Sequence, residues 1–368
     1  MRCTTPRFFD AMSRGSILPA HSELPQRPFV SIVMPVRNEE KFIVSVVEAV
    51  FEQNYPADRL ELLVVDGMST DRTRALVQEI QKRRSNVRLI DNPGRIVPTG
   101  FNAALGQAAG EVIVRMDGHC EYPHNYVSLV VQFREESGAD NFGGVLEPIG
   151  DSWTQRCICM AYHSRVGIGG AALKGHNGME VQHEVDAVHG GCWLLHRLRE
   201  VNGMDEEMVR NQDDELSFRL RKSGGKVMQS TALRVRYHVR NSFRQLFSQF
   251  AQYGYWKVRV VRKHPQQASL RHFVPGVFVA LVLLTAICAP FVTAAAWGFV
   301  GLWFFYFVGT GGASLLQFLG SGSPGLWPGT VVALLMMHVG YGIGFLLGWA
   351  RVLYGPLPSD RLFEQMTR

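Results

Sequence analysis

The chain has 368 residues, of which 46% are hydrophobic and 19% are charged, and its formal net charge is +6. This length accommodates one domain of about 250 residues together with an appended region. The basic residues are not interleaved with aromatic ones as in a nucleic-acid groove, so nucleic acid is excluded as an expected partner. The six cysteines lack the spacing of a zinc knuckle, and we interpret them as free thiols of a reducing compartment.

The first 28 residues form a predicted N-terminal tail. They contain scattered arginines and prolines but no apolar run long enough for a signal peptide. We therefore expect the large polar part of the chain to remain unexported.

Residues 29–240 show the pattern of an α/β domain. Short β-rich apolar runs alternate with segments whose apolar residues recur at helical spacing. Such alternation predicts parallel strands joined by right-handed crossovers, as in a Rossmann-like fold. In such sheets ligands bind beyond the carboxyl ends of the strands, where Asp66 and Asp117 stand. The predicted elements are, in order, strand 30–34, helix 39–53, strand 62–65, helix 72–84, strand 87–90, helix 98–109 and strand 112–116.

The second half of this domain is less regular. Strands are expected at 142–149 and at 187–196, the latter interrupted by two glycines, and a helix is expected at 213–222. Residues 241–272 follow as an amphipathic helix in which aromatic side chains alternate with arginine and lysine. We interpret it as lying in a membrane interface. A packing helix of the globule is the alternative.

Residues 273–350 contain no lysine, arginine, aspartate or glutamate. About 20 apolar residues suffice for one membrane helix. The stretch therefore predicts a transmembrane region of about three helices, at 273–293, 295–318 and 329–349. Two or four helices, or a buried helical subdomain, are the alternatives.

Basic residues just before the apolar stretch predict its orientation, because positive flanks stay inside. They are Lys257, Arg259, Arg262, Lys263 and Arg271. The polar domain is thus expected in the cytoplasm, on a multi-pass protein of the inner membrane. Three spans would place the C-terminal tail, 351–368, outside with its arginines, against the same rule. The number of spans is left open at this point.

Carboxylates at three places indicate a site for a nucleotide diphosphate, a metal ion and a general base. Asp66 ends a strand and can accept hydrogen bonds from a base or ribose, although a turn aspartate is the simpler interpretation. Asp117 and His119 follow another strand and can face one Mg²⁺ or Mn²⁺ ion. Asp213 and Asp214 begin a helix, where the helix dipole favours carboxylates and where one of them can act as a base. The combination points to sugar transfer.

Together these segments resemble the inverting family-two glycosyltransferases with the GT-A fold. The resemblance covers roughly residues 28–260 and rests on the order and spacing of segments 31–40, 64–73, 98–117 and 212–224. The run from Arg115 to Pro123 and the uncharged C-terminal helices resemble most the succinoglycan-type exopolysaccharide β-1,3-glucosyltransferases.

The resemblance implies a role for each candidate residue. It implies Asp213 as the catalytic base, with Asp214 as a candidate helper. It implies Asp117 and His119 as metal ligands, although the family usually has Asp at the position of His119. The donor-binding residues that it implies are Pro35, Arg37, Glu39, Asp66, Asp71, Asn102 and Arg115. At the acceptor or diphosphate it implies Gly190, Gly191, Trp193, Gln249, Tyr253 and Trp256.

The implied enzyme is a membrane-anchored, metal-dependent hexosyltransferase. It would move a sugar with inversion, glucose from UDP-glucose, to a polyprenyl-linked oligosaccharide in exopolysaccharide or cell-surface glycan synthesis, alongside polysaccharide-assembly proteins. The Gln-x-x-Arg-Trp motif of processive synthases is absent, which favours addition of a single sugar. One alternative is a polyprenyl-phosphate sugar transferase. The other is a non-catalytic membrane scaffold that binds sugar nucleotides, because Gln212 and His119 depart from the family pattern.

Overall fold

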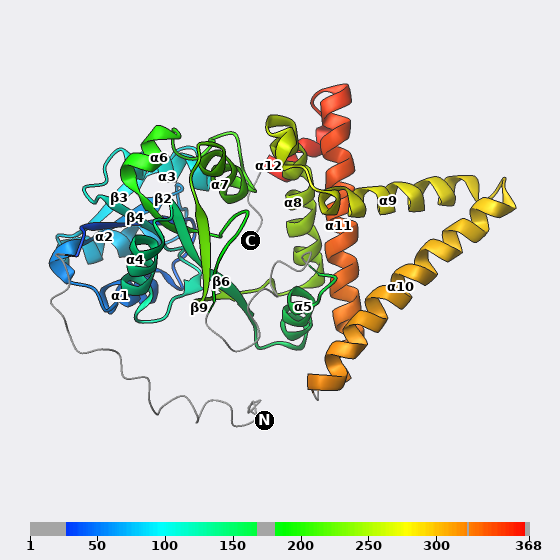
Figure 1. The fold of residues 1–368 in the computed structure, drawn as a ribbon, viewed down its shortest axis with the longest axis horizontal. Helices are drawn as coiled ribbons and strands as arrows, with labels where there is room; N and C mark the ends of the chain where they lie inside the picture. The colour runs from blue at the N-terminus through cyan, green and yellow to red at the C-terminus, as the bar shows by residue number, and fades with distance from the viewer. Residues whose placement is uncertain (1–26, 168–180, 322–323, 365–368) are drawn as a thin grey trace.

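The computed structural model of the chain describes residues 27–167, 181–321 and 324–364. Most of the predicted N-terminal tail and the last four residues of the predicted C-terminal tail lie outside these ranges. Figure 1 shows an α/β domain on one side and a set of long helices on the other.

The first half of the domain is the predicted parallel sheet with helical crossovers. Four strands lie side by side in the order β3-β2-β1-β4, and every pairing among them is parallel. The α/β fold class is therefore confirmed. The elements are β1 (Val30–Val36), α1 (Ile43–Phe51), β2 (Leu60–Asp66), α2 (Thr73–Arg83), β3 (Val87–Asp91), α3 (Val97–Leu105) and β4 (Val112–Arg115).

The second half extends the same sheet with mixed pairings. β8 pairs antiparallel with both β4 and β6, and β6 pairs parallel with β9. β5 and β7 complete the sheet at β9. The bounds are β5 (Cys120–Glu121), α4 (Tyr126–Ser137), β6 (Asn141–Ile149), α5 (Trp153–His163), β7 (Gln182–Glu184), β8 (Gly191–Leu194), α6 (Leu195–Glu200), α7 (Gln212–Lys222) and β9 (Val227–His238).

The predicted strand 187–196 is wrong in its extent. Gly190 and Gly191 have φ angles of +64° and +139°. Residues with side chains rarely adopt these conformations, so the chain turns there and the strand begins only at Gly191. At the other end the helix α6 starts at Leu195.

Helices cover both faces of the sheet, and each face has its own apolar core. Successive side chains of a strand point to opposite faces, so Leu62 and Val64 of β2 join one core whereas Leu63 and Val65 join the other. The first core packs under α1, α2 and α4, and the second under α3, α6 and α7. Burying one such side chain completely stabilises the fold by about 1.5–3 kcal/mol. The sheet is thus fixed from both sides, with its strand ends left at the edge.

The described part of the C-terminal region contains four long α-helices and a short one, with 3-10 turns between some of them. α9, α10 and α11 correspond to the three predicted apolar segments and are long and apolar enough to cross a membrane. The predicted helix 241–272 ends earlier, because α8 stops at Lys263 and a short 3-10 turn at Pro265–Gln267 separates it from α9. The bounds are α8 (Phe243–Lys263), α9 (Leu270–Cys288), α10 (Thr293–Ser321), α11 (Trp327–Tyr354) and α12 (Arg361–Glu364).

Glycines let α11 approach the backbone of α8 closely. A Cβ atom on Gly344 would lie 1.9 Å from the carbonyl oxygen of Ala251, and one on Gly340 would lie 2.7 Å from that of Phe247. Both distances are below those of ordinary contacts between a Cβ and a backbone atom. Small residues at four-residue spacing therefore hold the two helices together.

We expect Gly344→Ala to lower the thermal stability of the protein, because the added methyl group meets backbone and the helices must separate. Overpacking of this kind costs about 1–3 kcal/mol. Gly309→Ala in α10 is the matched control, since no atom lies within 4 Å of a Cβ there. Alanine is the better helix former by ~1 kcal/mol, so the control should keep or raise the melting temperature in detergent. Equal shifts for both variants would contradict the proposed close packing.

Candidate active site

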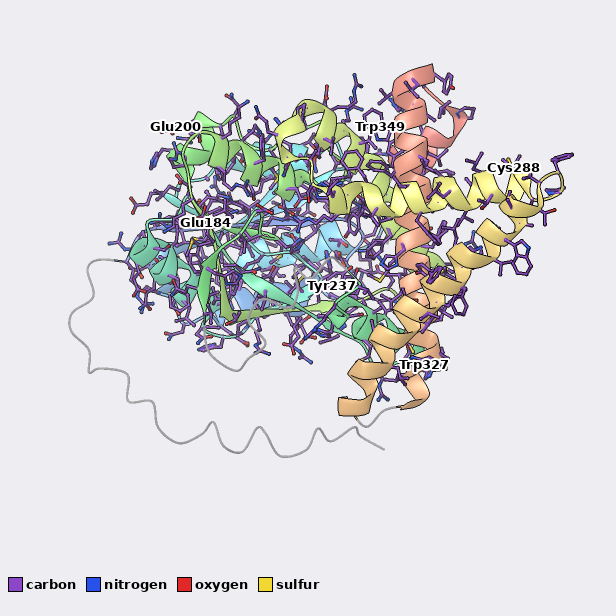
Figure 2. All side chains as sticks on the ribbon, turned by 45° about the vertical axis from the view of Figure 1, so that its right-hand side comes forward. Glu184, Glu200, Tyr237, Cys288, Trp327 and Trp349 are labelled. Atoms are coloured by element: carbon purple, nitrogen blue, oxygen red, sulfur yellow. The ribbon has the colours of Figure 1, made fainter. Side chains whose placement is uncertain are left out.

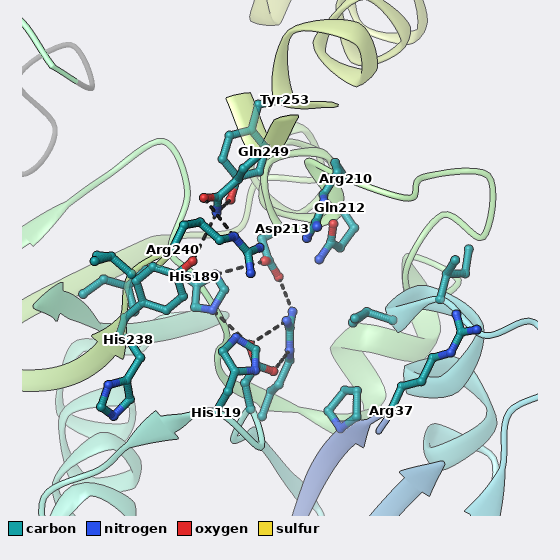
Figure 3. A pocket seen from close by; sticks show the side chains of 18 of the residues that line it. Arg37, His119, His189, Arg210, Gln212, Asp213, His238, Arg240, Gln249 and Tyr253 are labelled. Atoms are coloured by element: carbon teal, nitrogen blue, oxygen red, sulfur yellow. Dashed lines mark hydrogen bonds and ion pairs between the residues drawn. The ribbon is translucent and has the colours of Figure 1, made fainter. Parts of the chain in front are cut away.

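A cavity of about 1210 Å³ opens where the parallel strands end. Its walls come from the loops after β1, β3 and β4, the start of α7, and the helices α5 and α8. Figure 3 shows His119, His189 and Asp213 converging on one part of this cavity, with Arg37 apart from them. The cavity therefore joins the edge of the sheet to the helical region.

One buried arginine binds two of the predicted site residues. The Arg115 guanidinium donates through Nε and Nη2 to the Asp117 oxygens Oδ1 and Oδ2, at 2.7 and 2.9 Å. Its Nη1 donates to Asp213 Oδ1 at 2.8 Å. The Arg115 side chain is 3% exposed, so its charge is almost completely removed from water. Arg115 thus links the predicted metal ligand to the predicted base.

His189 completes this cluster and was not among the predicted residues. Its Nε2 lies 3.0 Å from Asp117 Oδ2, and its Nδ1 lies 3.6 Å from Asp213 Oδ2. Burial alone would lower the pKa of His189, but the hydrogen bond to Asp117 and the two carboxylate charges raise it above its ordinary value. The surroundings of His189 therefore favour its protonated form, which adds to the positive charge that Arg115 places beside the two aspartates.

The two carboxylates of the cluster are shifted in opposite directions. Burial disfavours ionisation of Asp117, but Arg115 and His189 outweigh it and hold the pKa well below its usual range. Burial raises the pKa of Asp213 above its ordinary value, and its cationic neighbours only partly compensate. Asp117 therefore stays ionised, whereas Asp213 has the greater affinity for a proton. A raised pKa is what a general base near neutral pH requires.

Asp214 is directed to a different partner. Its carboxylate forms an ion pair with Lys257 of α8 and is about one-third exposed. It lines the cavity beside Asp213. The lysine fixes the start of α7 against α8, so Asp214 connects the α/β domain to the helical region.

The residues predicted to bind the donor divide into two groups. Pro35, Arg37 and Glu39 line the cavity together with Arg115. Asp66, Asp71 and Asn102 do not belong to its lining and bond to nearby protein atoms. Asp66 accepts from the Ser69 amide at 3.2 Å, Asp71 from the Thr73 amide at 3.0 Å, and Asn102 pairs with the backbone of Met204 at 2.8 Å.

The residues predicted at the acceptor or diphosphate also divide. Gln249 and Tyr253 of α8 line the cavity and bond to each other, with the amide donating to the phenol oxygen at 3.0 Å. Gly190 lies just before β8, and Gly191 is the first residue of that strand. Trp193 and Trp256 lie outside the cavity lining, Trp193 packing edge-on against Phe101 in the core and Trp256 donating to the Phe363 carbonyl at 2.9 Å.

The predicted metal ligands both lie on the cavity wall. Burial lowers the pKa of His119 to about 4, so its imidazole is neutral, as a metal ligand must be. Within the described ranges no group of three or more His, Cys, Asp or Glu side chains is arranged to hold an ion. Both Asp117 oxygens also bond to Arg115 or His189, so an ion at Asp117 and His119 would need most of its ligands from a diphosphate and water, as Mg²⁺ commonly has at phosphates.

Residues 31–197 match the family model described as glycosyl transferase family 2. The chain carries a family 2 glycosyltransferase domain. This domain includes the sheet from β1 to β8 and the cluster of Arg115, Asp117 and His189. Asp213 and the long helices lie beyond the matched residues, and similarity to whole proteins extends over them.

Two curated proteins and one solved structure are similar to this chain beyond the matched domain. The succinoglycan biosynthesis protein ExoA of Rhizobium meliloti is 29% identical over 332 residues, 88% of this chain and 94% of the relative. A dolichyl N-acetyl-α-D-glucosaminyl phosphate 3-β-D-2,3-diacetamido-2,3-dideoxy-β-D-glucuronosyltransferase of Methanococcus voltae is 25% identical over 64% of this chain and 74% of the relative. A Pyrobaculum calidifontis mannosyltransferase, solved with GDP-mannose and Mn²⁺, is similar with a TM-score of 0.56, 17% identity and coverage of 87% and 88%. The α/β domain therefore has a GT-A-like fold, and apolar helices follow it.

Proposed function

We propose that this glycosyltransferase moves one sugar from a nucleotide donor to a lipid-linked glycan, with Asp213 as the base. The observation that carries the proposal is the cluster in which Arg115 binds both Asp117 and Asp213 on the wall of one cavity. The two carboxylates suit different roles. Asp117 stays charged, as a residue at the donor phosphates and their metal ion requires, whereas Asp213 has the higher affinity for a proton, as a base requires. Their joint attachment to one guanidinium fixes the distance between the place of the donor phosphates and the place of the acceptor hydroxyl.

The proposed donor is a UDP-sugar, with UDP-glucose as the first candidate. Pro35, Arg37 and Glu39 would hold the nucleotide at the edge of the sheet. Asp117 and His119 would hold a divalent ion, Mg²⁺ or Mn²⁺, which supplies positive charge to the diphosphate. The mannosyltransferase of similar fold was solved with a nucleotide sugar and Mn²⁺, which supports this arrangement.

In the proposed reaction an acceptor hydroxyl lies against Asp213. The carboxylate takes the hydroxyl proton while the oxygen forms a bond to the anomeric carbon of the sugar. The bond from that carbon to the diphosphate oxygen breaks on the opposite side, and the diphosphate leaves with its electron pair. The configuration at carbon is inverted. Arg115 and His189 keep the carboxylate oriented, and a positioned base of this kind contributes ~10²–10⁴-fold to the rate.

The proposed acceptor is a glycan on a polyprenyl carrier. The cavity continues between α5 and α8, where it is lined by Gln155, Tyr162 and Gln245. Arg210 and Arg240 stand on this side, and burial together with the neighbouring charge of Arg240 lowers the pKa of Arg210 below its ordinary value. Two neighbouring guanidiniums attract an anionic diphosphate. The names of the two relatives, with succinoglycan and a dolichyl-linked sugar, support a surface glycan.

Release of UDP from UDP-glucose, measured in membranes with and without extracted lipid-linked oligosaccharide, tests the proposal. Release that depends on the oligosaccharide supports it. Release with polyprenyl phosphate alone would favour the phosphate transferase, which needs no base. Binding without release in any mixture of donor sugars and acceptors would favour a non-catalytic scaffold.

We expect Asp117→Ala to abolish the metal-dependent part of nucleotide binding, because Asp117 is the ionised carboxylate at the cavity wall. Calorimetry of UDP with Mn²⁺ and with Mg²⁺ measures this. Asp91→Ala is the control, since Asp91 ends strand β3 of the same sheet and its exposed carboxylate pairs with Arg74. Unchanged UDP affinity in Asp117→Ala would remove the metal role of this residue.

A further inference from the structure

α11 packs along α8, and its first half also contacts α5 of the α/β domain. At its start, Thr330 Oγ1 donates to the Cys157 carbonyl of α5 at 3.4 Å. At its middle, His338 Nε2 lies 2.8 Å from the Val166 carbonyl oxygen, just after α5. Further on, a Cβ on Gly348 would lie 2.8 Å from the carbonyl of Tyr255 in α8. A helix of 28 residues extends about 42 Å, and both of its ends are on the same body.

Between these contacts, α11 shares a buried apolar core with α5 and α8. Ala333, Leu334 and Met337 of α11 are completely buried in a cluster with residues of α5 and α8, including Ile158 and Phe250. If α11 crossed a bilayer, α5 and α8 would be drawn to the same depth. The cavity and the charged residues of α8 would then lie in hydrocarbon, where charges are costly.

The C-terminal segment is also attached on the side of the active site. Tyr255 donates to Asp360 Oδ1 at 2.7 Å, and Arg351 forms an ion pair with the same carboxylate. Both Tyr255 and Lys257 belong to α8, and Lys257 holds Asp214 at the cavity. The segment around Asp360 therefore lies beside α8, so the number of complete crossings between α8 and this segment is even.

α9 and α10 instead extend away from this body. In α9 and in α10, 11% of the apolar stretch is buried, compared with 44% in α11. The helices leave from α11 and meet at a tip far from the domain, where Figure 2 shows Cys288. Phe291 at this tip is 85% exposed, and Trp297 of α10 is 72% exposed. Exposed apolar side chains of this number are stable in the hydrocarbon of a bilayer rather than in water. Basic Arg271, at the start of α9, would then lie at the membrane surface on the inner side.

We propose that α9 and α10 form a single hairpin inserted into the bilayer, while α11 stays on the catalytic side and does not cross. In this arrangement two helices enter the bilayer, instead of the three that the sequence predicted. It keeps Arg351 and the C-terminus on the same side as the basic residues of α8, as the positive-inside rule requires. It does not depend on the identity of the donor or acceptor.

Fusions at the C-terminus of the full chain in a bacterial host test the side of that end. A fluorescent protein that matures only in the cytoplasm should be bright, and alkaline phosphatase, which is active only outside, should be inactive. Three spans give the opposite pair of results, which would overturn the proposal. Both fusions should leave UDP release unchanged, so this outcome is independent of the proposed function.

A second measurement locates the hairpin in reconstituted vesicles of phosphatidylethanolamine and phosphatidylglycerol. Phe305→Cys at the middle of α10, where Phe305 is 73% exposed, carries a fluorescent maleimide label in a chain with Cys3, Cys159 and Cys288 replaced by Ser. Nitroxides attached to the lipid acyl chains should quench it. The same label on Val44→Cys of α1, where Val44 is 43% exposed, should not be quenched. An unquenched label at position 305 would exclude the inserted hairpin.

Discussion

Asp213→Asn is expected to reduce the transfer rate ~10²–10⁴-fold, the contribution of a positioned base, with little change in donor affinity. Asparagine keeps the shape of the side chain and can accept the Arg115 hydrogen bond through its amide oxygen. It cannot take up the acceptor proton. Steady-state transfer and calorimetric UDP binding measure the two quantities separately.

Asp214→Asn is the matched control, because Asp214 is the adjacent carboxylate and is paired with Lys257. We expect a much smaller loss of rate from it. If Asp213→Asn keeps more than about a third of the wild-type rate, a loss far below that of a base, the base lies elsewhere and Asp214 becomes the first alternative.

The same assignment fixes the direction of the pH dependence. A base must be ionised, so transfer should rise as pH increases through the pKa of Asp213. Since that pKa is raised, the rise should occur at higher pH than for an ordinary carboxyl group. In Asp213→Asn this rise of the transfer rate with pH should disappear, whereas Asp214→Asn should retain it.

Much of the sheet could be predicted because its signals are local. The apolar runs before Asp66 and Asp117, and the helical spacing between them, follow from neighbouring residues alone. The role of His189 could not be predicted in this way. It stands before Gly190 and Gly191, and antiparallel pairing of Gly191 with Arg115 returns the chain over the end of β4. That pairing joins residues more than seventy positions apart, and only the folded sheet reveals it.

In the helical region, too, contacts between distant residues could not be predicted from local sequence. The absence of charge across 273–350 predicted apolar helices correctly, but not which of them pack on the protein. The sequence carried no prediction for the glycines of α11, whereas in the structure Gly340 and Gly344 lie inside this helix against α8. Hydropathy averages over a segment. It does not register that one stripe of small residues faces a partner helix.

Arg115→Met is expected to destabilise the protein by about 3–5 kcal/mol at neutral pH, the usual cost of leaving buried charges without their partner. Methionine fills similar space without charge, so Asp117 and Asp213 remain close together with only His189 to balance them. Thermal unfolding in detergent measures the loss. Transfer should fall as well, because the base and the phosphate-binding carboxylate lose their common support.

Arg74→Met is the matched control for this effect. Arg74 also contacts two carboxylates, those of Asp66 and Asp91, but its side chain is 37% exposed. Solvent-exposed pairs contribute only about 0–1 kcal/mol, so the control should change stability little. A similar loss in both variants would show that burial of the Arg115 cluster is not the cause.

The dependence on pH separates electrostatic loss from loss of packing. In the wild-type protein the folded pKa of Asp117 lies below its unfolded value. The stability from this carboxylate is therefore present above the unfolded pKa, about 3.9, and is lost as pH falls through the folded value. Without Arg115 the folded pKa of Asp117 rises. The difference in stability between the wild type and Arg115→Met should then be largest at neutral pH and become smaller on acidification, whereas a packing defect would persist unchanged.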